Sequence, residues 1–126
     1  MIHFVGAGPG NPDLITIKGR DLLEKADILI WAGSLVSPDH LKYTKESCEI
    51  YDSKGMNLDE VIEVMLRGHK EGKEIVRLHT GDPTIYGAIR EQMDRLEEAG
   101  IDYEVVPGVS SFTGACAAIK REFTLP

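Results

Sequence analysis

The feature that most constrains this fold is an alternation of short apolar runs with segments of helical periodicity. The apolar runs are rich in aliphatic and β-branched residues, as buried strands are. Strands that alternate with helices form a parallel sheet with helices packed on its faces. We therefore expect an α/β fold, a five-stranded, mainly parallel sheet with flanking helices. The expected strands are residues 2–5, 26–31, 48–51, 75–79 and 103–106.

The segments between the strands carry helix signals. The clearest segment begins at Asn57, a good N-cap, and ends at Gly72, a good helix stop. Ile17 is expected to face the sheet from the first helix, and Pro83 to fix the turn that starts the fourth. The expected helices are residues 16–25, 35–46, 57–72, 85–99 and 110–120.

Length and composition place the chain among ordinary globular domains. Its 126 residues suggest one domain, and 42% hydrophobic with 28% charged residues is typical of such domains. A net charge of −7 argues against nucleic acid as a partner. No apolar run approaches the roughly 20 residues of a membrane span, so no membrane partner is expected. Two cysteines and no signal peptide predict a reduced, cytoplasmic protein.

Three expected strands are followed by loops rich in glycine and small polar residues, at 6–10, 80–87 and 107–111. The carboxyl ends of parallel strands share one edge of the sheet, where ligands bind in open α/β folds. Gly81 allows close approach to the backbone, and Asp82 offers a carboxylate that could face a ligand or a backbone amide. The three loops together predict a ligand cleft.

Other readings of these loops fit the residues less well. A dinucleotide fingerprint needs a third glycine where Asn11 stands, and Pro9 lacks the N–H that would face a pyrophosphate. A nucleophile elbow around Ser110 needs glycine where Phe112 stands. His79 is expected to be a packed side chain. The four histidines show no metal-ligand spacing, so no bound metal is expected.

The loop motifs carry a resemblance to a known family. Residues 5–16, Val-Gly-Ala-Gly-Pro-Gly-Asn-Pro-Asp-Leu-Ile-Thr, resemble the opening motif of the tetrapyrrole methylases, the S-adenosylmethionine enzymes of corrin and sirohaem synthesis. Residues 81–87 and 107–111 resemble their second and third motifs. Residues 32–37 and 112–115 resemble one branch, which methylates C-11 of precorrin-4 or cobalt-precorrin-4.

The resemblance implies a domain organisation. Family members have two α/β domains, with the cofactor in the cleft between them. Residues 1–126 would be the N-terminal domain alone, and residues 123–126 would mark the boundary to a C-terminal domain that this chain lacks. A homodimer is also implied.

The resemblance further implies S-adenosyl-L-methionine as cofactor, no protein-bound metal and a tetrapyrrole substrate. No catalytic residue is assigned, because an enamine-like ring carbon needs no covalent catalysis. Lys18, Lys54 and Arg90 are candidates to meet substrate carboxylates. The implied cofactor residues are Pro9, Thr80, Gly81, Asp82, Ile85, Ser110 and Ser111, and the implied substrate residues are Gly8, Ser34, Lys54 and Tyr86.

One departure bears on the substrate. Uroporphyrinogen-III members carry an aspartate, proposed as a base, where Ala32 stands here, which agrees with the C-11 branch. Lys54 matches a substrate lysine of the family, but a solvated loop lysine explains it equally well. Two alternatives stay open: a non-catalytic domain that binds cofactor weakly or only self-associates, and a family member acting on another substrate, such as another precorrin or diphthine.

Overall fold

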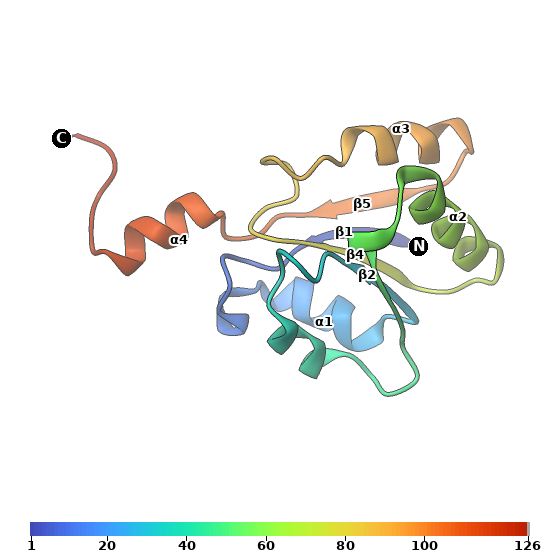
Figure 1. The fold of residues 1–126 in the computed structure, drawn as a ribbon, viewed down its shortest axis with the longest axis horizontal. Helices are drawn as coiled ribbons and strands as arrows, with labels where there is room; N and C mark the ends of the chain where they lie inside the picture. Colours follow the sequence, from blue (N-terminus) through green and yellow to red (C-terminus); the bar gives the residue numbers. More distant parts are fainter. Residues whose placement is uncertain (126) are drawn as a thin grey trace.

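The computed structural model describes residues 1–125, whose five strands form one parallel sheet (Figure 1). The strand order is β3-β2-β4-β1-β5, and every neighbouring pair runs parallel. The predicted fold class is confirmed. Pro126, the last residue of the predicted domain boundary, lies outside the described residues. The strands are β1 Ile2–Gly6, β2 Ile28–Trp31, β3 Glu49–Asp52, β4 Ile75–His79 and β5 Tyr103–Val106.

Helices cover both faces of this sheet (Figure 1). Successive residues of β1 point to opposite faces, so Phe4 enters one core cluster and Val5 the other. The Phe4 cluster is closed by α2 (Leu58–Lys70) and α3 (Arg90–Glu98). The Val5 cluster is closed by α1 (Ile17–Lys25) and the 3₁₀ helix η2 (Pro38–Tyr43). Helix α4 (Ser111–Ala118) projects away from the sheet and has no buried residue.

Side-chain caps fix where the helices start. Thr16 caps α1 by accepting a hydrogen bond from the Gly19 N–H at 2.9 Å. Asn57 and Glu60 form a reciprocal capping box at the start of α2. These two predicted starts are confirmed. The predicted helix 35–46 is only the short η2, which Ser37 caps.

Two local predictions were wrong. Ile17 is 73% exposed, because it lies six positions before the buried Leu23 and successive helical residues are about 100° apart. Helix α3 begins at Arg90 rather than at residue 85, so Pro83 does not start it. Among residues 1–125, none of the helices combines the length and the apolar character that crossing a bilayer requires.

The edge strand β3 is tied to its neighbours by ion pairs around Glu49. Its carboxylate accepts hydrogen bonds from Lys73 at 2.8 Å, the Tyr51 hydroxyl at 3.0 Å and Arg67 at 3.1 Å. These bonds, that of Lys73 above all, lower the pKa of Glu49 from 4.5 to about 2. The folded protein therefore holds this proton more weakly than the unfolded chain.

This shift predicts a pH dependence of stability. The contribution of Glu49 is fully present above about pH 4.5 and is lost as the pH falls toward 2. As the pH falls from 4.5 toward 2, the free energy of unfolding of a Glu49→Gln variant should therefore decrease less than that of the wild type. Urea denaturation at a series of pH values measures this. An equal dependence of the free energy of unfolding on pH in the two proteins would contradict it.

Candidate functional site

The loops that follow β1 and β4 are joined through their backbones. The N–H of Gly81 donates to the carbonyl of Gly8 at 2.8 Å, and the N–H of Gly8 donates to the carbonyl of Gly81 at 3.2 Å. Strand β1 lies between β4 and β5, so the loop after β5 starts on the other side of β1. The fold therefore brings the three predicted loops to one edge of the sheet.

Glycines allow this close approach. A Cβ atom on Gly6 would lie 2.6 Å from the carbonyl oxygen of Gly81 and 2.7 Å from the Cα of Gly108. Gly81 has a φ of 60°, a left-handed conformation that glycine adopts without strain. At the crossing point the three loops thus touch backbone to backbone, with no room for side chains.

Asp82 ties the loop after β4 to the loop after β5. Its Oδ2 accepts the N–H of Gly108 at 3.0 Å, and its Oδ1 accepts the N–H of Thr84 at 2.8 Å as well as the Thr84 hydroxyl. Burial opposes ionisation, but these hydrogen bonds outweigh it and lower the pKa of Asp82. The sequence left open whether this carboxylate faces a ligand or a backbone amide, and the structure shows that it accepts backbone amides.

The first loop also contacts α4. A Cβ atom on Gly114 would lie 2.6 Å from the Cβ of Pro9, so the ring of Pro9 packs directly on the helix. A groove of about 560 Å³ runs between these two segments, and Ser111 contributes to its lining. The hydroxyl of Ser110 caps α4 by accepting the N–H of Phe112 at 3.3 Å. Two residues with implied cofactor contacts, Pro9 and Ser111, therefore line one groove.

Thr80, Ile85 and Tyr86, three further residues with implied contacts, lie in the loop after β4. Thr80 directly follows β4, and Ile85 is 53% exposed. Tyr86 is fully exposed, and it lines a hollow of about 290 Å³ together with Pro83 and Arg90. Lys18 instead pairs with Glu104 of β5 at 3.2 Å, so the structure gives it a structural partner.

Lys54 and Ser34 lie in neighbouring turns at the ends of β3 and β2. Asp52 links these turns, because its Oδ1 accepts the N–H groups of Lys54 and Gly33, each at 3.0 Å. Those two amides, Lys54 first, lower the pKa of Asp52. Asp52 carries no local sequence signal for this role, since the role depends on a contact between adjacent strands.

Arg77 of β4 donates to the hydroxyl of Ser53 in the turn after β3, and the sequence did not mark it as a site residue. The available signal was a charged residue within an otherwise buried strand. His79 packs against Phe4, with ring centroids 6.1 Å apart, which confirms the prediction of a packed side chain. Burial, and then the charge of Arg77, lower the pKa of His79 to about 3, so the ring is neutral at physiological pH.

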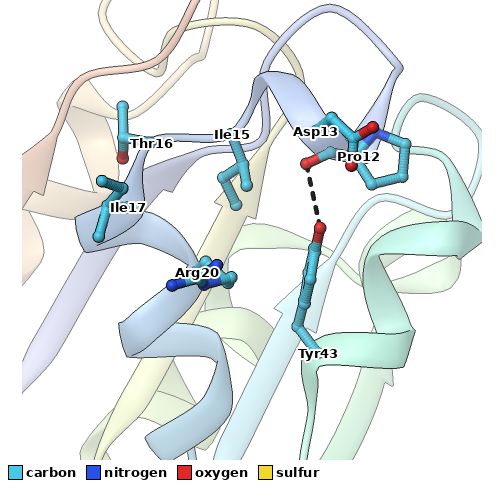
Figure 2. A pocket seen from close by; sticks show the side chains of 7 residues that line it. All are labelled: Pro12, Asp13, Ile15, Thr16, Ile17, Arg20 and Tyr43. Atoms are coloured by element: carbon cyan, nitrogen blue, oxygen red, sulfur yellow. Dashed lines mark hydrogen bonds between the residues drawn. The ribbon is translucent and has the colours of Figure 1, made fainter.

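A smaller hollow of about 170 Å³ flanks the segment after the first loop (Figure 2). The hydroxyl of Tyr43 in η2 donates to the carbonyl of Pro12 at 3.3 Å, and Arg20 of α1 lines the same hollow. This bond anchors the 3₁₀ turn η1 (Pro12–Leu14) that follows the loop. Within residues 1–125, no group of three or more His, Cys, Asp or Glu side chains is placed to hold a metal ion.

The strained backbone of Tyr86 predicts a stabilising substitution. Its φ of 56° is left-handed, which costs a non-glycine residue roughly 1–2 kcal/mol. Glycine removes that cost but adds freedom to the unfolded chain, so Tyr86→Gly should raise the free energy of unfolding by about 0.5–1 kcal/mol. Chemical denaturation measures this. Tyr86→Ala keeps the strained backbone, so its free energy of unfolding should not rise. An equal rise in the two variants would contradict the explanation.

Fold and site together define a class: an α/β domain whose loops meet at the carboxyl edge of a parallel sheet, the place where open α/β folds bind small molecules. The family model of the Tetrapyrrole (Corrin/Porphyrin) Methylases matches residues 1–126. The chain belongs to this family.

Individual relatives agree with this assignment. The chain is 58% identical over 125 residues to cobalt-precorrin-4 C(11)-methyltransferase of Methanocaldococcus jannaschii, covering 99% of this chain and 48% of the relative. It is 44% identical over 126 residues to precorrin-4 C(11)-methyltransferase of Pseudomonas aeruginosa, covering 99% of this chain and 50% of the relative. The chain thus spans about half the length of the curated relatives it matches.

Solved structures show the same fold. The X-ray structure of a cobalamin biosynthetic enzyme, cobalt precorrin-4 methyltransferase, superposes with a TM-score of 0.96 at 50% identity, over 99% of this chain and 52% of that one. Uroporphyrin-III C-methyl transferase from Thermus thermophilus, complexed with S-adenosyl homocysteine, superposes with a TM-score of 0.74 at 32% identity. That match covers 90% of this chain and 47% of the other.

Proposed function

We propose that this chain is the N-terminal domain of a two-domain, S-adenosylmethionine-dependent methyltransferase of cobalamin biosynthesis. Its substrate would be precorrin-4 or cobalt-precorrin-4, methylated at C-11. The observation that carries this proposal is the superposition on cobalt precorrin-4 methyltransferase with a TM-score of 0.96 over 99% of this chain, which includes all three loops. The 58% identical relative supports the same reaction.

The residues at the sheet edge fit this cofactor. The groove between the first loop and α4 has an apolar lining with a few polar groups, as small-molecule sites have. Among residues 1–125, the hydroxyls of Thr80 and Ser111 make no hydrogen bond within the protein, so both are free to bind a ligand. The glycines at 8 and 81 have no side chain between a ligand and the backbone. When bound, S-adenosylmethionine supplies an electrophilic methyl group.

The chain's own residues would act by binding and positioning. Asp82 would hold the second and third loops in one geometry through Gly108, rather than contact the cofactor through an open carboxylate. Thr80, Gly81 and Ser111 would contact the cofactor, with Pro9 and Ile85 as apolar contacts. Fixing two reactants in line contributes roughly 7–11 kcal/mol in favourable cases. No catalytic base is proposed.

The turns after β2, β3 and β4 would face the substrate. Ser34, Lys54 and Tyr86 lie in these turns, and the ammonium of Lys54 suits a carboxylate-bearing tetrapyrrole. Gly8 would border the same cleft from the first loop. The homodimer stays a prediction from the family resemblance, and the cytoplasmic location stays a prediction from the sequence.

Methyl transfer by the two-domain protein tests this function. Isotope-labelled S-adenosylmethionine is supplied with precorrin-4 or cobalt-precorrin-4 in parallel, and the product is located by mass spectrometry and NMR. The expected result is one labelled methyl group at C-11 of one of the two substrates. Transfer to neither substrate, or to another carbon, would overturn the proposal. The present chain, assayed alone, distinguishes an autonomous enzyme from a domain that only binds.

A further inference from the structure

Arg77 carries a charge inside the sheet without a counter-charge. It lies in the central strand β4, and burial lowers its pKa to about 10, so it remains charged at neutral pH. Among residues 1–125, no carboxylate lies within ion-pair distance of its guanidinium. Arg77 is half-buried, and an unpaired charge that has lost part of its hydration is costly, so a counter-charge from outside the domain would be favoured here.

The guanidinium joins the turn after β3 to helix α3. Its Nη1 donates to the hydroxyl of Ser53 at 3.2 Å, directly before Lys54. Its Nε donates to the side-chain oxygen of Gln92 at 3.3 Å, and the amide nitrogen of Gln92 donates to the carbonyl of Ala88 at 3.2 Å. Since a guanidinium has five N–H groups, these bonds leave donors available.

His79, on the same strand, has a polar atom without a hydrogen-bond partner. It lies two residues after Arg77, so the two side chains share one face of the sheet. The side chain is 8% exposed, and its buried Nε2 has no hydrogen-bond partner among residues 1–125. A buried polar atom without a partner costs free energy that a ligand could restore.

We propose that Arg77, with Ser53 and His79 beside it, receives one carboxylate of the tetrapyrrole substrate at the carboxyl edge of β4. The inference rests on the proposed function, which supplies a carboxylate-bearing substrate. The planar guanidinium matches a carboxylate in two-point hydrogen bonding. Arg77 is hydrogen-bonded to Ser53 beside Lys54, and through Gln92 to the loop that contains Tyr86. A carboxylate bound to Arg77 would therefore also fix those two segments.

The test is a titration of uroporphyrin III, a stable tetrapyrrole with only carboxylate side chains, into the two-domain protein saturated with S-adenosylhomocysteine. Binding is followed by absorbance. Arg77→Met should weaken binding by roughly tenfold or more. Gln92→Glu should weaken it similarly while raising the thermal midpoint, because it gives Arg77 an internal counter-charge. Gln92→Met removes the hydrogen bonds of Gln92 to Arg77 and Ala88 without adding charge, and it should stay within about threefold of the wild type.

Wild-type affinity in Gln92→Glu, or no uroporphyrin binding by the wild type, would overturn the inference. Gln92→Glu keeps the test decisive if Arg77→Met fails to fold. Affinity for S-adenosylhomocysteine, measured in every variant, separates the two proposals. If the variants keep their affinity for S-adenosylhomocysteine while uroporphyrin binding does not respond to the substitutions, only the carboxylate site fails. If the wild type does not bind S-adenosylhomocysteine, the proposed function fails.

Discussion

Replacing Gly6 with alanine is expected to lower the free energy of unfolding by about 3 kcal/mol and to abolish S-adenosylhomocysteine binding. The added Cβ would lie 2.6 Å from the carbonyl oxygen of Gly81 and 2.7 Å from the Cα of Gly108. Both neighbours are backbone atoms, so neither can rotate aside as a side chain could. Relief requires the three loops to separate, which would open the proposed cofactor site.

Chemical denaturation and calorimetric titration measure the two effects of Gly6→Ala. Gly55→Ala is the matched control, because nothing lies within 4 Å of a Cβ atom at Gly55. It should change the free energy of unfolding by no more than about 0.5 kcal/mol. A Gly6→Ala protein that is as stable as the Gly55→Ala protein would refute the close-packed crossing.

The second large effect is expected for Asp82→Asn, which should lose about 2 kcal/mol of stability together with cofactor-product binding. Both carboxylate oxygens of Asp82 accept hydrogen bonds, one from Gly108 and the other from Thr84. An asparagine side chain has one acceptor oxygen, so its NH₂ group must face an N–H donor on one side. The near-isosteric change therefore breaks either the link to Gly108 or the Thr84 bond that holds the side chain in place.

The control for Asp82→Asn is Asp39→Asn. Asp39 is an exposed residue of η2 whose carboxylate makes no hydrogen bond or ion pair among residues 1–125. Its substitution should leave both stability and binding unchanged within about 0.5 kcal/mol. If Asp82→Asn binds S-adenosylhomocysteine as tightly as Asp39→Asn does, Asp82 does not organise the site.

The sheet could be predicted because its signals are local. Apolar runs marked all five strands, and Thr16, Asn57 and Ser110 marked the starts of three helices. The convergence of the glycine-rich loops followed from parallel topology alone. These features depend only on periodicity and capping chemistry, both of which are set by residues close together in the sequence.

The start of α3 could not be predicted in this way. Residues 85–89 look helical, yet Tyr86 and Ala88 have left-handed φ values of 56° and 53°. A contact distant in sequence anchors the loop before this segment, because the N–H of Gly108 donates to the carboxylate of Asp82. Tertiary contacts therefore override the local helix preference.

The same limit applies to the site residues. Asp82 was predicted as a site residue, but its bond to Gly108 depends on a loop 26 residues away. Asp52 and Arg77 gave weaker signals, because each joins segments that are adjacent only in the folded sheet. An arginine within an apolar strand is visible in the sequence, whereas its missing counter-charge is visible only in the structure.

Three loops of this chain are proposed to hold the cofactor. Isothermal titration of S-adenosylhomocysteine into the chain, with Asp82→Ala as the control, measures this binding. We expect the wild type to bind measurably and the Asp82→Ala variant to lose that binding. Absence of binding by the wild type, or equal binding by the variant, would contradict it.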